Sequence, residues 1–306
     1  DSIYHEHLED HNEPIFFHQF VSRAGQSDLR FLCEAQFSSM LPSTYSEETR
    51  ATLSKIAPDI IQMEQYMDFV RNRKFRQTLL CHGDVVPKRS IKPERIENLF
   101  VSAPLRRREP AENTVDPSAV VFEHGDGRKL TVTNPIQVAG FERLAALWPG
   151  NIPIEELVIE VCEGRPAETR PSLEECRREL TETLLELFSS NLVSLWGCGF
   201  DCTSTIDDPP RTHALARYQS ARGGRVTNLR HESVHLNQLE REIVRRLDGE
   251  VSIDRITSEL LDDCVKAPPN QDGSAPGEGT KPSSEELRKA IVNRLERLAG
   301  AALLKG

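Results

Sequence analysis

Apolar positions recur at helical spacing through the first part of the chain. They predict a helix over residues 14–25, a short strand over residues 29–37, and two further helices over residues 47–57 and 58–76. A helix, a glycine and a strand in this order are typical of an α/β unit. One strand cannot form a sheet alone, so we expect this strand to find its sheet partners elsewhere.

A second pattern begins at residue 118, where short strands precede a set of helices. Residues 120–122 and 130–133 are apolar runs on either side of a glycine-containing turn, which predicts a β-hairpin because glycine readily adopts positive φ. Three helices are expected next, and they begin after Asn134, at residue 154 and at Ser172. A strand over residues 192–196 is expected to close the module.

The same plan returns in the last third of the chain. Residues 225–236 are expected to be extended, and Asn237 is expected to cap a helix. Apolar positions over residues 253–260 and 287–298 predict two further helices. Residues 265–283, between these two helices, are rich in Pro, Gly, Ser and Asp, which predicts a disordered loop.

Two short runs align at a constant offset and indicate an internal repeat. They are GNIPIEEL at residues 150–157 and GEVSIDRI at residues 249–256. Three small helices with a hairpin are the winged-helix plan. We therefore predict an α+β, mainly helical fold, in which an amino-terminal helical region with a short αβ unit precedes two winged-helix-like modules. The expected boundaries are 1–100 for the first region, 101–117 for a linker, and 118–202 and 203–306 for the modules.

Composition narrows the function classes. The chain of 306 residues carries a net charge of -10, which argues against a dedicated nucleic-acid binder. No run of apolar residues is long enough to span a membrane, so no membrane contact is expected. The seven cysteines contain no C-x-x-C pair, which fits reduced thiols in a cytoplasmic protein.

The most unusual stretch is YMDFVRNRKFRQTLLCH at residues 66–82, which is too apolar for a linker and too charged for a core helix. Its arginines could bind a phosphate or a carboxylate with two parallel hydrogen bonds. Alternatively, they pair with nearby acids (Asp68, Glu64 and Asp59) and fasten this helix to its neighbours, which is the interpretation we favour. The candidate interface or ion-pair residues are Asp68, Arg71, Arg73 and Arg76.

Residues 231–235 read HESVH and match the HExxH pattern of zinc proteases. That chemistry needs both histidines on one face of a helix. Asn237 and Glu240 form a capping box, however, so the helix is expected to begin after the motif. A structural role is therefore favoured over a zinc site.

Three other motifs also favour a structural interpretation. HEHLEDH at residues 5–11 has the wrong spacing for a metal motif and is expected to be a solvated acidic segment, and LWGCGF at residues 195–200 has too few glycines for a nucleotide loop. Cys81 and His82 are adjacent and cannot easily face each other. No catalytic, cofactor-binding or metal-binding residue is assigned.

Several long runs nevertheless resemble a known family. They are YHEHLEDHNEPIFFHQF, LCEAQFSSMLP, APDIIQMEQYMDFVRNRKFRQTLLCH and RVTNLRHE. Together they resemble the methyltransferase regulatory domain that follows the catalytic domain in bacterial S-adenosylmethionine-dependent methyltransferases. This group includes rickettsial lysine methyltransferases that modify outer-membrane proteins. The likeness covers roughly residues 1–100, and the two modules resemble the carboxyl-terminal part of the same proteins.

In that family the methyl donor is bound by a D/E-x-G-x-G-x-G motif upstream of this region, and this chain has no such motif. The resemblance therefore implies a non-catalytic region, which regulates the enzyme or recruits a protein substrate, with S-adenosylmethionine (SAM) bound elsewhere in the parent methyltransferase. The implied partners are a catalytic domain, in cis or in trans, and a protein substrate. The opening helix and strand resemble the last αβ unit of the catalytic fold.

Two other function classes stay open. A nucleic-acid-binding protein with tandem winged helices would use basic residues on the third helix of each module, but five glutamates between residues 174 and 186 oppose this in the first module. The basic candidates for nucleic-acid binding on the third helices are Arg177, Arg178, Arg288, Lys289, Arg294 and Arg297.

The other open class is a zinc hydrolase, which would use His231, Glu232 and His235.

Overall fold

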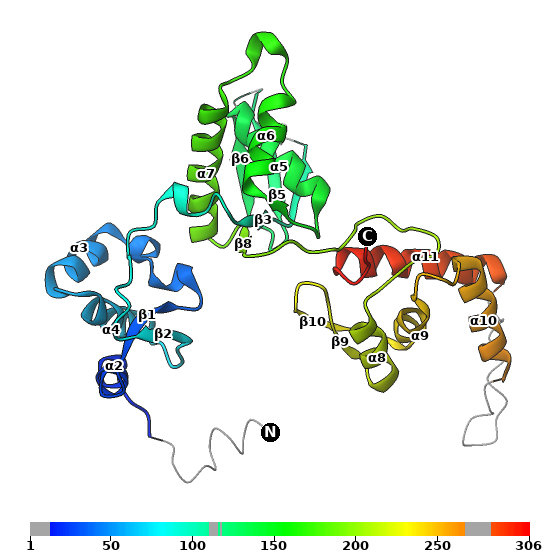
Figure 1. Cartoon of the computed structure of the whole chain (residues 1–306), viewed down its shortest axis with the longest axis horizontal. Helices are drawn as coiled ribbons and strands as arrows, with labels where there is room; N and C mark the ends of the chain where they lie inside the picture. The colour runs from blue at the N-terminus through cyan, green and yellow to red at the C-terminus, as the bar shows by residue number, and fades with distance from the viewer. Residues whose placement is uncertain (1–12, 110–115, 117, 267–282) are drawn as a thin grey trace. The chain divides into compact units, whose positions relative to one another are not determined.

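The computed structural model describes residues 13–109, 116, 118–266 and 283–306, and it divides the chain into two units (Figure 1). The first unit comprises Asp1–Ile91 with Ser189–Asn191, and the second comprises Lys92–Phe188 with Leu192–Gly306. The chain combines helices with small sheets and is mainly helical, as predicted. The expectations for residues 5–11 and for most of the loop at 265–283 fall outside the described residues.

The first unit packs helices against a two-stranded sheet. Its elements are α2 (Phe17–Gly25), β1 (Leu29–Glu34), η1 (Phe37–Met40), η2 (Pro42–Thr44), α3 (Glu47–Ile56), α4 (Ile60–Arg71) and β2 (Thr78–His82). Ser46 caps α3 and Asp59 caps α4, because their side-chain oxygens accept hydrogen bonds from backbone N–H groups. Phe17, Phe31 and Met67 are buried between these elements.

Helix α4 ends earlier than predicted. The apolar pattern predicted a helix as far as Arg76, but Asn72 adopts a left-handed conformation with φ of 50° and ends the helix after Arg71. Asparagine tolerates this conformation because its short polar side chain can hydrogen-bond locally. The chain then turns back into β2, which pairs antiparallel with β1. The strand predicted without a partner therefore finds one within the described residues.

The second unit opens with a module of three long helices and two small sheets. Its elements are η3 (Pro93–Arg95), β3 (Phe100–Ser102), β4 (Leu105–Arg108), β5 (Val120–His124), β6 (Lys129–Val132), α5 (Pro135–Leu147), β7 (Ile152–Pro153), α6 (Ile154–Glu163), η4 (Ala167–Thr169), α7 (Leu173–Ser189) and β8 (Ser194–Trp196). The predicted hairpin is β5–β6, and Asn134 caps α5 as expected. The strand orders are β7-β3-β8 and β4-β5-β6.

The predicted linker at residues 101–117 is instead partly structural. It supplies most of β3, the middle strand of one sheet, and all of β4, an edge strand of the other. Val101 and Ala103 are completely buried. The many prolines suggested a linker, but Pro104 lies between the two strands and so interrupts neither.

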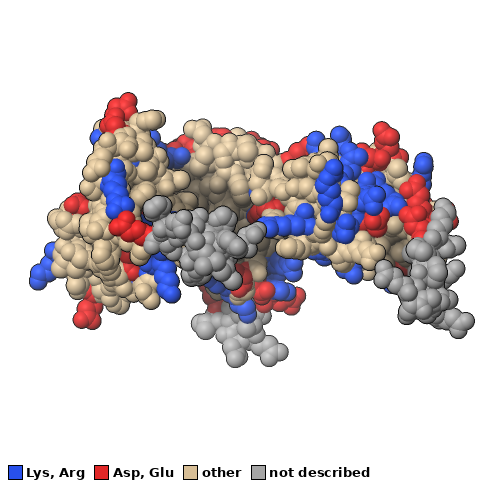
Figure 2. Space-filling view, turned by 90° about the horizontal axis from the view of Figure 1, so that it is seen from below, with Lys and Arg blue, Asp and Glu red and all other residues tan. Residues whose placement is uncertain are grey.

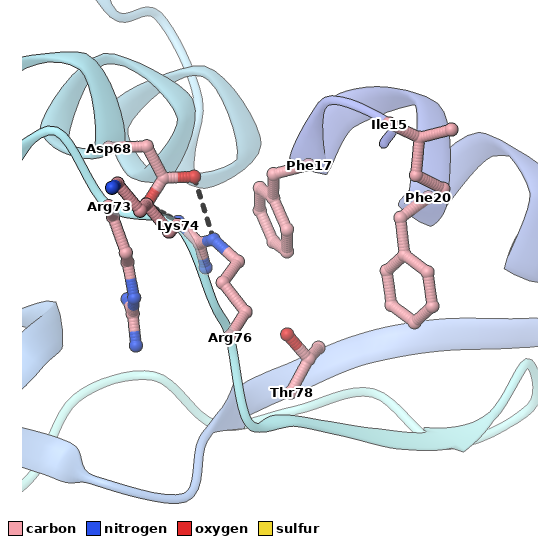
Figure 3. Close-up of a pocket in the computed structure, with 8 residues that line it drawn as sticks. All are labelled: Ile15, Phe17, Phe20, Asp68, Arg73, Lys74, Arg76 and Thr78. Atoms are coloured by element: carbon pink, nitrogen blue, oxygen red, sulfur yellow. Dashed lines mark hydrogen bonds and ion pairs between the residues drawn. The ribbon is translucent and has the colours of Figure 1, made fainter. Parts of the chain in front are cut away.

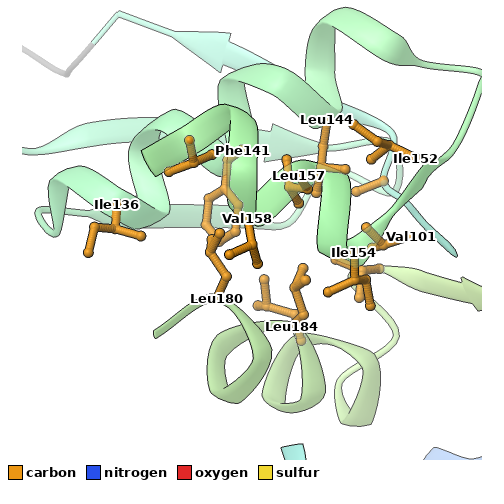
Figure 4. Packing of buried hydrophobic residues seen from close by; sticks show 14 of the residues in the cluster. Val101, Ile136, Phe141, Leu144, Ile152, Ile154, Leu157, Val158, Leu180 and Leu184 are labelled. Atoms are coloured by element: carbon orange, nitrogen blue, oxygen red, sulfur yellow. The ribbon is translucent and has the colours of Figure 1, made fainter. Parts of the chain in front are cut away.

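One apolar cluster holds this first module together. Phe141 on α5 meets Phe122 on β5 edge to face, with ring centroids 5.6 Å apart. Figure 4 shows side chains from α5 and α6 pointing toward Leu180 and Leu184 of α7. The core thus consists mainly of the apolar positions that predicted the three helices.

The second module repeats this order of helices. Its elements are α8 (Ala214–Arg222), β9 (Arg225–Thr227), β10 (Ser233–His235), α9 (Gln238–Arg246), α10 (Ile253–Lys266) and α11 (Ser284–Gly300). Helices α6 and α10 begin at equivalent positions of the predicted repeat, and α7 and α11 each have 17 residues. The capping box of Asn237 and Glu240 is confirmed. Helix α8 was not predicted, because its buried positions are the small residues Ala216 and Ser220.

Candidate functional site

The charged stretch that follows α4 forms a buried ion network in the first unit. Arg76 contacts three carboxylates, with its Nη1 at 2.6 Å from Glu34, its Nη2 at 3.0 Å from Glu64 and its Nε at 2.8 Å from Asp68. Arg73 binds the second oxygen of Glu34 at 3.0 Å. The side chain of Glu34 is fully buried and that of Glu64 is 2% exposed. Water is therefore largely excluded from this network.

Local structure explains why these groups meet. Glu34 ends β1 opposite Thr78 of β2, whose hydroxyl donates a hydrogen bond to Glu34 at 2.8 Å. The left-handed Asn72 reverses the chain, so that Arg76 returns to α4, which carries Glu64 and Asp68. The Arg76 guanidinium also stacks 3.7 Å above the ring of Phe17 on α2. One arginine thus connects α2, β1 and α4.

Arg71 has a different role from the other two arginines. It donates hydrogen bonds to the backbone carbonyl oxygens of Ser39 and Leu41 and to the hydroxyl of Thr44, and it stacks on the Tyr45 ring at 4.7 Å. These contacts fasten η1 and η2 to the end of α4. Among the acids expected as partners, Asp59 instead caps α4 by accepting a hydrogen bond from the N–H of Gln62.

Burial sets the electrostatics of the network. It raises the pKa of Glu64, and the charge of Arg76 offsets only part of that rise. Burial alone would lower the pKa of Arg76, but its hydrogen bonds and its attraction to Asp68, Glu34 and Glu64 raise it overall. All three nitrogens of the Arg76 guanidinium already bind acceptors within the chain. This geometry suits a structural network better than a ligand site.

A cavity of about 350 Å³ lies beside the network (Figure 3). The rings of Phe17 and Phe20 form one side, and the charged residues form the other. Lys74, which also lines the cavity, forms no ion pair with any described residue. The lining residues are Ile15, Phe17, Phe20, Asp68, Arg73, Lys74, Arg76 and Thr78.

The HESVH segment does not form the helix that a zinc protease needs. Ser233–His235 form strand β10, and His231 lies in a turn with φ of 60°. The Glu232 carboxylate is bound to Arg230 and Asn228. No group of three His, Cys, Asp or Glu side chains that could hold a metal ion occurs among the described residues.

The glycine turn after β8 likewise lacks a strand-turn-helix geometry. The side chain of Asn151 binds the carbonyl oxygen of Cys198 and the N–H of Phe200, both at 2.9 Å, and the next helix begins only at Ala214. In β2, Cys81 and His82 are successive strand residues, whose side chains point to opposite faces.

Four of the six candidate cations on the third helices form ion pairs, whereas Arg178 and Lys289 form none with the described residues. Arg177 on α7 pairs with Glu155, and Arg288 on α11 pairs with Asp254 at 2.6 Å. Arg297 on α11 binds the buried Glu240 at 2.5 Å. These contacts leave little positive charge for a nucleic acid on the helices that a winged helix would use to bind it.

Comparison with known proteins identifies two domains. Residues 1–82 match the family model of a predicted methyltransferase regulatory domain, and residues 208–303 match that of the PKMT C-terminal winged helix domain. None of the described helices is both long and apolar enough to cross a membrane.

Two uncharacterised proteins of Rickettsia prowazekii (strain Madrid E) are similar in sequence. The first is 27% identical over 319 residues, which cover 98% of this chain and 55% of the relative. The second is 24% identical over 210 residues, which cover 64% of this chain and 82% of the relative. The chain thus spans about half the length of the first relative.

Two solved structures of PKMT2 from Rickettsia typhi share the fold, one of them in complex with AdoHcy. Their TM-scores are 0.82 and 0.81 at 24% identity, and the match covers 99% and 100% of this chain but 61% of each PKMT2 chain. The solved structures show the fold, and the two matching domain models associate the chain with methyltransferases. It carries a methyltransferase regulatory domain at residues 1–82 and a PKMT-type C-terminal winged helix domain at residues 208–303.

Proposed function

We propose that this chain is a non-catalytic region of a SAM-dependent methyltransferase that acts on protein, and that it regulates the enzyme or recruits its substrate. A separate catalytic domain, in the same protein or in another chain, binds SAM. The two modules serve as scaffolds or protein-binding units, and the setting is the cytoplasm.

The observation that carries this proposal is the β1–β2 sheet of the first unit. It has only two strands, so each strand has an edge without a strand partner among the described residues. Two-stranded sheets are marginal by themselves, and a free edge readily accepts another strand. Here the ion network holds the pair in place. The side chain of Leu79 on β2 is also 45% exposed, although it is apolar. A catalytic domain would complete this sheet.

The lengths of the relatives also support a separate catalytic domain. The model matching residues 208–303 describes a C-terminal domain, so we place the uncovered part of the longer relatives upstream of the region that matches this chain. The presence of AdoHcy in a PKMT2 structure supports SAM as the methyl donor of the parent enzyme. A net charge of -10 would attract basic, lysine-bearing substrates over long range.

Docking of the catalytic domain on the sheet edge is tested by replacing Leu79 with Glu. A charge on the edge strand opposes pairing with a further strand. We expect the variant to bind a separately produced catalytic domain about tenfold more weakly, roughly 1.4 kcal/mol, in a calorimetric titration.

The matched control is Val86→Glu, which makes the same change at a side chain that is 77% exposed outside the sheet. It should bind as tightly as the original chain. Equal weakening by both variants, or no complex with the original chain, would contradict docking on this sheet.

A further inference from the structure

One segment of the second module is strongly basic within an acidic chain. Residues 211–246 contain eight arginines, no lysine and three glutamates, which gives a local net charge of +5. The whole chain has a net charge of -10. Figure 2 shows Lys and Arg side chains gathering over the part of the second unit that carries α8 and α9. This local reversal of sign is not explained by the role proposed above.

Three of these arginines lie near the turn between α8 and β9. Arg222 ends α8, and Arg225 begins β9. Arg241 of α9 joins them, because its Nε donates a hydrogen bond to the carbonyl oxygen of Ser220 at 3.0 Å. The turn itself needs Gly224, since a Cβ there would lie 2.8 Å from the carbonyl oxygen of Leu236. Glycine therefore lets the hairpin and α9 close tightly against α8.

These three arginines lack acidic partners. Within the described part of the chain, none of them forms an ion pair with a carboxylate, whereas Arg245 and Arg246 both pair with Glu242. Arg225 donates to the hydroxyl of Ser233 at 2.6 Å, which uses only one of its nitrogens. Each guanidinium has five N–H donors, so most of them stay available.

Aromatic and apolar side chains adjoin these charges. The guanidinium of Arg222 stacks 3.5 Å from the ring centroid of Tyr218. Tyr218 is 56% exposed, and Leu215, one turn earlier on α8, is 50% exposed. Tyrosine and arginine, with tryptophan, are enriched among the residues that dominate protein–protein binding energy. We call Tyr218, Arg222, Arg225 and Arg241 the arginine surface.

We propose that the arginine surface binds an acidic segment of a partner protein, with partner carboxylates on the guanidinium groups and an apolar partner side chain over Tyr218 and Leu215. Arginine is suited to this because its planar group binds a carboxylate through two parallel hydrogen bonds. A nucleic acid fits less well, since the arginines of α11, the helix that a winged helix would use to bind it, are engaged in ion pairs. This binding does not depend on the proposed methyltransferase role.

The test measures binding of a fluorescent peptide in which glutamates alternate with leucine and tyrosine, added to the full chain. We expect saturable binding that weakens with added salt and that the same peptide with Gln for Glu does not show. The double variant Arg222→Glu, Arg225→Glu should bind the peptide at least about tenfold more weakly. Circular dichroism reports whether the variant is folded. If it is not, the pair Arg222→Gln, Arg225→Gln replaces it.

The matched control is Arg50→Glu with Lys55→Glu, which makes the same change in charge at exposed positions of α3 in the first unit. It should bind the peptide like the original chain, apart from a small general loss. The proposal is overturned if the original chain does not bind the peptide, or if the control loses as much affinity as the arginine variant. Tighter binding of a mixed-sequence DNA duplex, lost in the arginine variant, would also overturn it by assigning the surface to nucleic acid.

Discussion

At the scale of single residues, Arg76 pairs with three carboxylates of the first unit. Two of its acidic partners, Glu64 and Asp68, lie 12 and 8 residues away and could be proposed from their helical spacing. The third, Glu34, lies 42 residues away on β1 and could not, because no local pattern indicates which strand end packs against a helix. The sequence thus predicted ion pairs between these arginines and nearby acids. It did not predict that the pairs join strand β1 to helix α4.

Replacing Arg76 with Ala should strongly destabilise this region. The buried carboxylates of Glu34 and Glu64 and the partly buried carboxylate of Asp68 would lose an ion-pair partner, and removal of one member of a buried ion pair costs about 3–5 kcal/mol. Hydrogen exchange of the amides in β1, β2 and α4, followed by mass spectrometry, measures this loss locally.

Arg23→Ala serves as the control, because the Arg23 side chain is 58% exposed and its contact with Glu13 is 3.5 Å long. It should change the protection of the same amides by less than about 1 kcal/mol. Similar effects of the two substitutions would contradict a structural role for the Arg76 network.

At the scale of elements, the sequence-based predictions were wrong where the local pattern of apolar residues and prolines disagrees with the tertiary packing. The helical pattern continued past Arg71, but Asn72 ended α4 and released Arg73 and Arg76 into an extended segment. Prolines suggested a linker at residues 101–117, yet β3 forms the middle of a buried sheet. Caps were predicted well, as at Asn134 and Asn237, because a cap depends on a few neighbouring residues.

Helix α4 should become easier to open as the pH rises. Burial raises the pKa of Glu64 above the value of 4.5 that it has when exposed, so the folded state holds this proton more tightly than the unfolded state. The stabilising contribution is therefore complete below pH 4.5 and is lost as the pH rises through the raised pKa. Hydrogen exchange of α4 amides at several pH values, corrected for intrinsic exchange rates, measures the opening free energy.

A Glu64→Gln variant provides the control, since glutamine keeps the shape and does not titrate. Its opening free energy should vary less with pH over the same range. An opening free energy of α4 that rises with pH in the original chain would contradict the raised pKa.

At the scale of the whole molecule, the fold class could be predicted from the sequence. The short repeat at residues 150–157 and 249–256 correctly located the start of α6 and of α10, because equivalent helices begin with the same pattern. The arginine surface could not be predicted, since it forms only when α9 packs against the turn after α8. The proposed function rests on the long sequence runs that resemble methyltransferase regulatory domains, because the chain carries no catalytic motif from which it could be inferred.

The central claim is that this chain does not bind the methyl donor by itself. A calorimetric titration of S-adenosylmethionine into the purified chain tests it most directly, with PKMT2 from Rickettsia typhi, which has been solved in complex with AdoHcy, as the positive control. The account predicts no binding heat with the chain alone and saturable binding with PKMT2. Saturable binding to residues 1–306 alone would contradict it and would place a methyl-donor site within this chain.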